Sequence, residues 1–168
     1  MARLKPLNAT AQRIWPWLAL AALVAALDQA TKHILSSNFR VGEVREIAGF
    51  LNLVFVYNRG AAFSFLSDAA GWQRGLFIGI ALVAVVVIVA LLAKYPGERL
   101  FSAGLALILG GALGNVWDRI VLGQVVDFLD FHAFGHHWPA FNVADSAITV
   151  GAALLVLDAL RPRAKQPG

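Results

Sequence analysis

The chain has 168 residues, of which 59% are hydrophobic and only 14% are charged, whereas a soluble domain usually carries about 25% charged residues. So few charged side chains could not cover the apolar ones in water, and we expect a single domain embedded in a membrane. The formal net charge is only +4, and no nucleic-acid partner is expected. The absence of cysteine excludes disulfides, thiolate catalysis, cysteine-ligated metals and lipidation of this chain at cysteine.

The first apolar segment spans about residues 14–35 and follows several basic residues. Basic residues before a stretch rich in Ala and Leu also fit a cleaved signal peptide. This stretch, however, continues into Asp28 and Lys32 instead of a plain small-residue cleavage site. We therefore interpret it as a retained membrane-spanning helix.

The next segment, residues 36–71, is too polar to span a membrane and contains two runs rich in β-branched and aromatic residues. Residues 41–48 and 50–57 are predicted to be strands, with Gly49 as a turn or bulge residue between them. Residues 61–66 could form a short amphipathic helix at the membrane interface. A small β-sheet on the outer membrane face is therefore expected.

Three more apolar segments follow, at about 75–93, 100–117 and 139–160. Each of the four segments approaches the ~20 residues that cross ~30 Å of hydrocarbon, and all are too long for barrel strands. The predicted fold is therefore mainly α, with four transmembrane helices.

Basic residues indicate how the helices are oriented. They occur in both terminal tails and, as Lys94 and Arg99, in the short connection between the second and third segments. These parts lie on one side of a four-helix topology, so both termini are expected in the cytoplasm. Residues 36–71 and 120–138 would then lie on the outer side, together with most of the unusual polar residues.

Two aspartates, Asp127 and Asp145, are each surrounded by aromatic and aliphatic neighbours. Ionised carboxylates near hydrocarbon are costly and often functional. Two of them close together would share a proton and could activate water, as in aspartic proteases. The alternative is that each aspartate caps a helix or pairs with an arginine, and the residues alone leave both open. For Asp68, Asp130 and Asp158 we favour that structural alternative.

Other polar residues are predicted near the same outer boundary. Asp28 and Lys32 lie one helical turn apart and can neutralise each other, which makes insertion tolerable. The remaining candidates have structural alternatives as turn or interfacial residues; they are Asn58, Gly60, Asn115, Asp118, Arg119 and Asn142.

No metal or organic cofactor is expected. His132, His136 and His137 match no standard zinc spacing. Two other functions remain open: a small proton- or ion-coupled transporter that uses the buried carboxylates, and a non-catalytic membrane subunit. A transporter would need polar groups on a path to both membrane faces, and the second segment has no charge between Arg74 and Lys94.

Five stretches, taken together, resemble the lipoprotein signal peptidases (signal peptidase II) of bacteria. They are DQATK at 28–32, NRGAAF at 58–63, GNVWDR at 114–119, VVDFLDF at 125–131 and FNVADS at 141–146. Each stretch alone is weak, but five in the family's order on a four-helix chain of this length are highly specific.

The resemblance implies an aspartyl endopeptidase of the bacterial inner membrane. Its substrate would be a prolipoprotein, cut just before a diacylglyceryl-modified cysteine, and membrane lipids would surround it. Asp127 and Asp145 match the catalytic pair, and the other polar candidates match residues that line or support the site. The resemblance also implies binding of cyclic peptide antibiotics such as globomycin. Nothing in the sequence demands more than a monomer.

Overall fold

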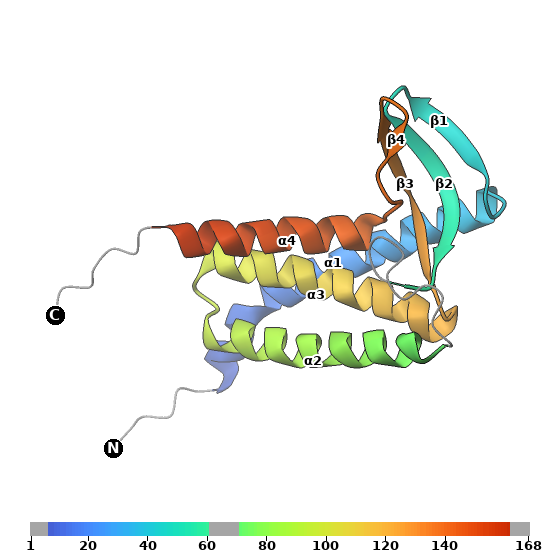
Figure 1. The fold of residues 1–168 in the computed structure, drawn as a ribbon. Coiled ribbons are helices and arrows are strands. Elements are labelled where there is room, and N and C mark those ends of the chain that lie inside the picture. Colours follow the sequence, from blue (N-terminus) through green and yellow to red (C-terminus); the bar gives the residue numbers. More distant parts are fainter. Residues whose placement is uncertain (1–6, 61–70, 162–168) are drawn as a thin grey trace, which may run out of the picture.

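The helices form a bundle that carries a small β-sheet at one end (Figure 1). The computed structural model describes residues 7–60 and 71–161, and of residues 7–13 it describes the backbone alone. Within these residues the helices are α1 (Leu7–Asn38), α2 (Trp72–Lys94), α3 (Arg99–Val121) and α4 (Val143–Leu160). Each of them, α1 counted from Ile14, is long and apolar enough to cross a membrane. The predicted fold class, four spanning helices with a small sheet, is confirmed.

Helix α3 packs against all three other helices, and glycines allow the close approach. A Cβ on Gly104 would lie 2.8 Å from the carbonyl oxygen of Gly151 in α4, and one on Gly110 would lie 2.5 Å from that of Ala21 in α1. Small residues of this kind let membrane helices pack backbone to backbone. The glycines of α3 therefore set the spacing that holds the polar residues of three helices together.

The sheet has four antiparallel strands in the order β1-β2-β3-β4. Their bounds are β1 (Val44–Ala48), β2 (Leu51–Asn58), β3 (Val125–Ala133) and β4 (His136–His137). The first two strands were predicted, with a turn at Gly49, but the sheet is not confined to residues 36–71. Strand β3 comes from the connection between α3 and α4 and pairs Asp127 with Val56. The short helix expected at 61–66 lies outside the described residues.

The segment between β4 and α4 is attached to β3. The backbone N–H of Phe141 donates to the carbonyl oxygen of Leu129 at 3.0 Å, and the Leu129 N–H donates back at 2.8 Å. Helix α4 therefore begins at Val143 and not near Pro139 as predicted, because this extended stretch is bound to the sheet until Asn142 caps the helix. The attachment brings the first turn of α4 beside β3.

The two ends of the bundle differ in charge and in composition. The α2–α3 connection, with Lys94 and Arg99, and the end of α4 lie at the end opposite the sheet (Figure 1). Between the helices lies an apolar cluster that includes Ile88, Leu92 and Leu109. Among the described residues, the buried ionisable side chains come, in contrast, from the ends of α1 and α3 that lie near the sheet and from strand β3 of the sheet itself.

Candidate active site

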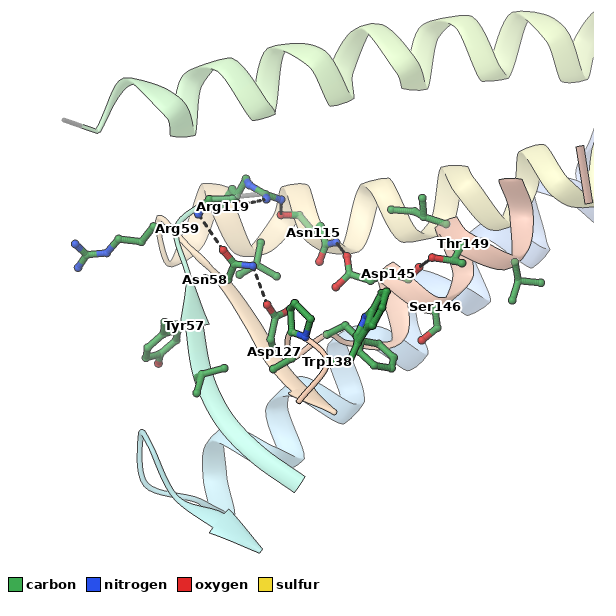
Figure 2. Close-up of a pocket in the computed structure, with 18 residues that line it drawn as sticks. Tyr57, Asn58, Arg59, Asn115, Arg119, Asp127, Trp138, Asp145, Ser146 and Thr149 are labelled. Atoms are coloured by element: carbon green, nitrogen blue, oxygen red, sulfur yellow. Dashed lines mark hydrogen bonds between the residues drawn. The ribbon is translucent and has the colours of Figure 1, made fainter. Parts of the chain in front are cut away.

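A cavity of about 870 Å³ opens between the sheet and the ends of α3 and α4. Asp127 of β3 and Asp145 of α4 both line it, and Figure 2 shows the two side chains projecting into the same space. The other lining residues include Asn58 at the end of β2, Gly60 just after it, and Asn115 and Arg119 of α3. The fold thus brings together candidates that are up to 87 positions apart in the chain, from residue 58 to residue 145.

Asp127 is almost fully buried, with 2% of its surface exposed, but both of its carboxylate oxygens accept hydrogen bonds. The Asn142 amide donates to Oδ1 at 2.7 Å, and the Asn58 amide donates to Oδ2 at 3.0 Å. Burial, and then the nearby Asp145 carboxylate, raise the pKa of Asp127 to about 7, and the two amide bonds oppose that rise. This carboxyl can therefore keep a proton close to neutral pH.

Asp145 both caps helix α4 and lines the cavity. It is the third residue of α4, where its Oδ2 accepts from the backbone N–H of Asn142 at 3.3 Å while its own N–H donates to Asn142 Oδ1 at 2.9 Å. This reciprocal pair is a capping box, in which two end groups of a helix satisfy each other. Its other oxygen, Oδ1, accepts from the Asn115 amide at 2.8 Å. Capping leaves Asp145 on the cavity wall, so the structural alternative does not remove it from the site.

Asn142 and Asn115 connect the two carboxylates. Besides Asp127, the buried Asn142 amide contacts Oδ1 of Asn115 at 3.2 Å and the carbonyl oxygen of Val126 at 3.1 Å. Since Asn115 donates in turn to Asp145, an unbroken chain of side chains joins Asp127 to Asp145. Two carboxyls held this way, one able to keep a proton, can act as a general acid and a general base.

Lys32 is the buried cation behind this pair. Its Nζ lies 2.8 Å from Oδ2 of Asp28 and 2.8 Å from Oδ2 of Asp118, and it donates to Oδ1 of Asn115 at 3.0 Å. These three partners use all three ammonium hydrogens. The predicted Asp28–Lys32 pair is therefore present, and it is part of a larger network that ends on a cavity residue.

Asp28 and Asp118 also accept hydrogen bonds from the backbone of other elements. Oδ1 of Asp28 accepts from the N–H of Ala144 in the first turn of α4 at 2.9 Å, and Oδ2 of Asp118 accepts from the N–H of Val126 in β3 at 3.2 Å. A carboxylate at a helix N-terminus accepts a hydrogen bond from a free N–H there, and its negative charge interacts favourably with the positive end of the helix dipole. The network thus positions both elements that carry the two cavity aspartates.

Two members of this network were not predicted as site residues. The amide of Gln29 donates to Oδ1 of Asp118 at 2.9 Å and to the carbonyl oxygen of Gly114 at 3.1 Å. Gly114 leaves room for Asp28, because a Cβ on it would lie 2.5 Å from the Asp28 Oδ2. The sequence signals for them were their places next to a charged or polar candidate and inside two of the stretches that carry the family resemblance, 28–32 and 114–119.

Arg119 and Asn58 hold the chain that follows β2. The Arg119 guanidinium donates to the carbonyl oxygen of Gly60 at 3.1 Å and lies 5.0 Å from the ring centroid of Phe77 in α2. The Gly60 N–H donates to Oδ1 of Asn58 at 2.9 Å, and Asn58 also binds Asp127. The cavity wall at Gly60 is thereby linked both to α3 and to one of the two aspartates.

Asp130 and Asp158 are not among the residues that line the cavity. Asp130 accepts from the amide of Asn52 at 2.9 Å and contacts the ring of His137 at 2.9 Å, so its partner is a histidine and not the helix cap or arginine expected. The ring of His132 stacks on that of His137. Asp158 is near the other end of α4, and Asp68 lies outside the described residues.

The chain is similar in sequence to proteins of a known family. The sequence model of the family described as "Signal peptidase (SPase) II" matches residues 20–161. The lipoprotein signal peptidase of Ralstonia nicotianae is 58% identical over 148 residues, covering 88% of this chain and 86% of that protein. The lipoprotein signal peptidase of a Janthinobacterium species is 51% identical over 161 residues, covering 96% of this chain and 98% of that protein.

Solved structures agree in fold. One, described as a bacterial membrane enzyme solved by the in meso method at 2.3 Å resolution, is 32% identical with a TM-score of 0.78. The match covers 86% of this chain and 87% of that one. A second, described in the same words at 1.9 Å resolution, has a TM-score of 0.77 and covers 88% and 94% of the two chains.

Proposed function

The chain belongs to the signal peptidase II family, multi-pass membrane proteases that process lipoproteins, and we propose that it cuts prolipoproteins with Asp127 and Asp145 as an aspartic dyad. In this proposal the signal peptide is removed just before a diacylglyceryl-modified cysteine. The observation that carries it is the single cavity lined by both carboxylates, which Asn142 and Asn115 link to each other.

The dyad works with one shared proton. The ionised carboxylate takes a proton from a water molecule as the water oxygen attacks the carbonyl carbon of the scissile peptide bond. The protonated carboxyl hydrogen-bonds to the carbonyl oxygen and stabilises the charge that develops on it. A proton then passes to the leaving nitrogen as the C–N bond breaks, and this frees the amine of the cysteine and the carboxyl end of the signal peptide.

The surroundings of each carboxyl support this division of work. Burial favours a proton on Asp127, whose pKa is raised to about 7. Asp145 is held by the Asn115 amide and the Asn142 N–H, donors that oppose the effect of its burial. The positive charge of Arg119 acts on both aspartates and limits their repulsion. The dyad therefore operates with protein groups and water, without a metal or organic cofactor.

The substrate's lipid explains the position of the site. Acyl chains on the cysteine stay in the bilayer and hold the scissile bond at headgroup depth. The cavity lies at the sheet end of the helices, where α3 ends and α4 begins. Cyclic peptide antibiotics of the globomycin type should occupy the same cavity and compete with the substrate. No step needs a second copy of the chain, so we propose that a monomer acts.

The orientation follows from the charges at the ends of the bundle. Lys94, Arg99 and Arg161 lie at the end opposite the sheet, and an excess of basic residues is typical of cytoplasmic connections. We infer that both termini face the cytoplasm and that the cavity opens at the outer face of the bacterial inner membrane.

A transport function is less well supported. It would require polar groups along a route between the two ends of the bundle. Among the described residues, the buried ions Asp28, Lys32 and Asp118 all belong to the network near the sheet. The interhelical cluster that includes Leu92 and Leu105 is apolar.

Cleavage of a lipidated prolipoprotein by protein in liposomes tests the proposal. We expect Asp127→Asn and Asp145→Asn each to reduce the rate to background while the purified proteins remain folded. Asp158→Asn, at the other end of α4, is the matched control and should cleave normally. Near-normal turnover by either dyad variant would exclude the aspartic mechanism.

A further inference from the structure

The turn between β3 and β4 presents an aromatic residue in an unusual way. Phe134 has a φ of +51° and is fully exposed, at 103% of its reference surface, and Gly135 follows with a φ of +77°. Two successive positive φ values favour Asn, Asp or Gly in a hairpin turn. Phenylalanine is strained there and buries nothing within the described chain. The folding of the turn therefore does not explain this residue.

Further aromatic rings line the same part of the sheet. Phe131 stacks on Phe50 with ring centroids 6.1 Å apart and on Phe141 at 5.7 Å. Phe50 is 57% exposed, and Trp138, in the segment just after β4, is 60% exposed. Phe131 lies four residues after Asp127 in one strand, and alternate residues of a strand share a face. These rings thus extend the face that carries Asp127.

The opposite face of this outer half of the sheet is polar. Asn52 and Asp130, which pair across β2 and β3, hydrogen-bond to each other, and the His137 ring covers the carboxylate. Glu46 of β1 pairs with Asn52 and is exposed. The outer half of the sheet is therefore amphipathic, with aromatic rings on one face and charged or polar groups on the other.

The position of the hairpin shows what the aromatic face meets. The β3–β4 hairpin projects sideways past α4, level with the first turn of that helix (Figure 1). The outward surface of α4 is apolar, with Val150 at 52% and Val156 at 59% exposure. In a membrane-spanning helix, lipid covers such a surface. Trp138 and Val150 line the same cavity, so the lipid-facing side of α4 continues into the aromatic face.

We propose that Phe50, Phe131, Phe134 and Trp138 form a membrane-interface surface that rests on the lipid leaflet beside α4. Aromatic side chains concentrate at the depth of the headgroups, where Phe134 finds the apolar contact that it lacks among the described residues. The surface keeps the outer half of the sheet on the bilayer. Since Asp127 lies on the same strand as Phe131, the contact also fixes the depth of the catalytic cavity. This inference concerns membrane contact and does not depend on the peptidase chemistry.

Spin labelling tests it directly, because the natural chain has no cysteine to remove. Phe134→Cys and, as a matched control on the polar face, Glu46→Cys are each labelled with a nitroxide in vesicles of phosphatidylethanolamine and phosphatidylglycerol. Oxygen, which concentrates in lipid, and a water-soluble nickel chelate then compete for collision with the label. We expect oxygen to dominate at position 134 and the nickel chelate at position 46. Dominance of the nickel chelate at both positions would overturn the proposal.

A second variant separates anchoring from folding. Asn suits a positive φ better than Phe, so Phe134→Asn should leave the protein folded. We expect a nitroxide at Phe50→Cys to collide with the nickel chelate several times more often in this variant than in the parent. An unchanged collision ratio would show that Phe134 does not hold the sheet on the lipid.

Discussion

Gly114→Ala places one methyl group where the buried network has no room for it. A Cβ at this position would lie 2.5 Å from Oδ2 of Asp28 and 3.1 Å from its Cγ, well inside van der Waals contact. Asp28 has no exposed surface, and Oδ2 is already bound by Lys32 at 2.8 Å while Oδ1 is bound by the N–H of Ala144 at 2.9 Å. The carboxylate therefore cannot turn away without weakening one of these contacts.

The expected magnitude has two parts. Inserting a methyl group into a packed interior costs about 1–3 kcal/mol, and a weakened hydrogen bond to a charged group costs about 1.5–3 kcal/mol. Because one movement of the Asp28 carboxylate relieves the first cost while causing the second, we expect the free energy of unfolding to fall by about 2–4 kcal/mol in total. Cleavage should slow as well, since a shift of about 1 Å in a catalytic group can cost roughly 100-fold in rate.

Unfolding by sodium dodecyl sulfate, with cleavage of a lipidated peptide measured in parallel, checks both effects. Gly79→Ala in α2 is the control, because a Cβ there meets nothing within 4 Å. That variant should be as stable as the parent or slightly more so, since Ala favours a helix more than Gly does. If Gly114→Ala is as stable and as active as Gly79→Ala, the network does not constrain the site as argued.

Four further predictions concern the proposed dyad and the buried charges around it. Burial and the Asp145 charge raise the pKa of Asp127 from its usual 3.8 to about 7. The dyad therefore keeps its shared proton below that pH and loses it above. In a pH series, kcat/KM should fall as the pH rises through about 7. Asn58→Ala, which removes a hydrogen bond that lowers this pKa, should move the midpoint of that fall to higher pH; a midpoint that does not move would count against Asp127 as its source. Lys32→Met leaves two buried carboxylates without their cation and should lower the free energy of unfolding, measured by detergent titration, by about 3–5 kcal/mol. Incubation with EDTA should leave the cleavage rate unchanged, and a loss that added metal restores would refute a dyad acting without metal.

The helices could be predicted because hydropathy reports the solvent of each segment directly. Long apolar runs indicated all four spans, and the first two strands followed from their β-branched and aromatic residues. Strand β3 was missed as a strand, although Val125 and Val126 are β-branched and Phe128 and Phe131 are aromatic. Its two aspartates interrupt the apolar pattern that predicts a strand. Its partner strand also lies about 70 residues earlier in the chain, as in the pairing of Asn58 with Val125, and no local sequence pattern reveals so distant a pairing.

The candidate site was predictable as a set of residues but not as an arrangement. Ionisable residues stand out in apolar segments because they are costly near hydrocarbon, and Asp127, Asp145 and Lys32 could be selected in this way. Their partners depend on how three helices pack, and Gln29 and Gly114 gained their places only through contacts across that packing. Asp145 shows why a structural and a functional interpretation could not be separated in advance, since one carboxylate caps α4 and lines the cavity.

The most direct test of the central claim is whether the two carboxylates act as one unit. Cleavage of a lipidated prolipoprotein should be measured for Asp127→Asn, for Asp145→Asn and for the double variant under the same conditions. Residues that form a single catalytic unit are not additive, so we predict that each single variant falls to the same background rate and that the double variant is no slower. Losses that multiply, or a single variant that retains near-normal turnover, would contradict a shared dyad.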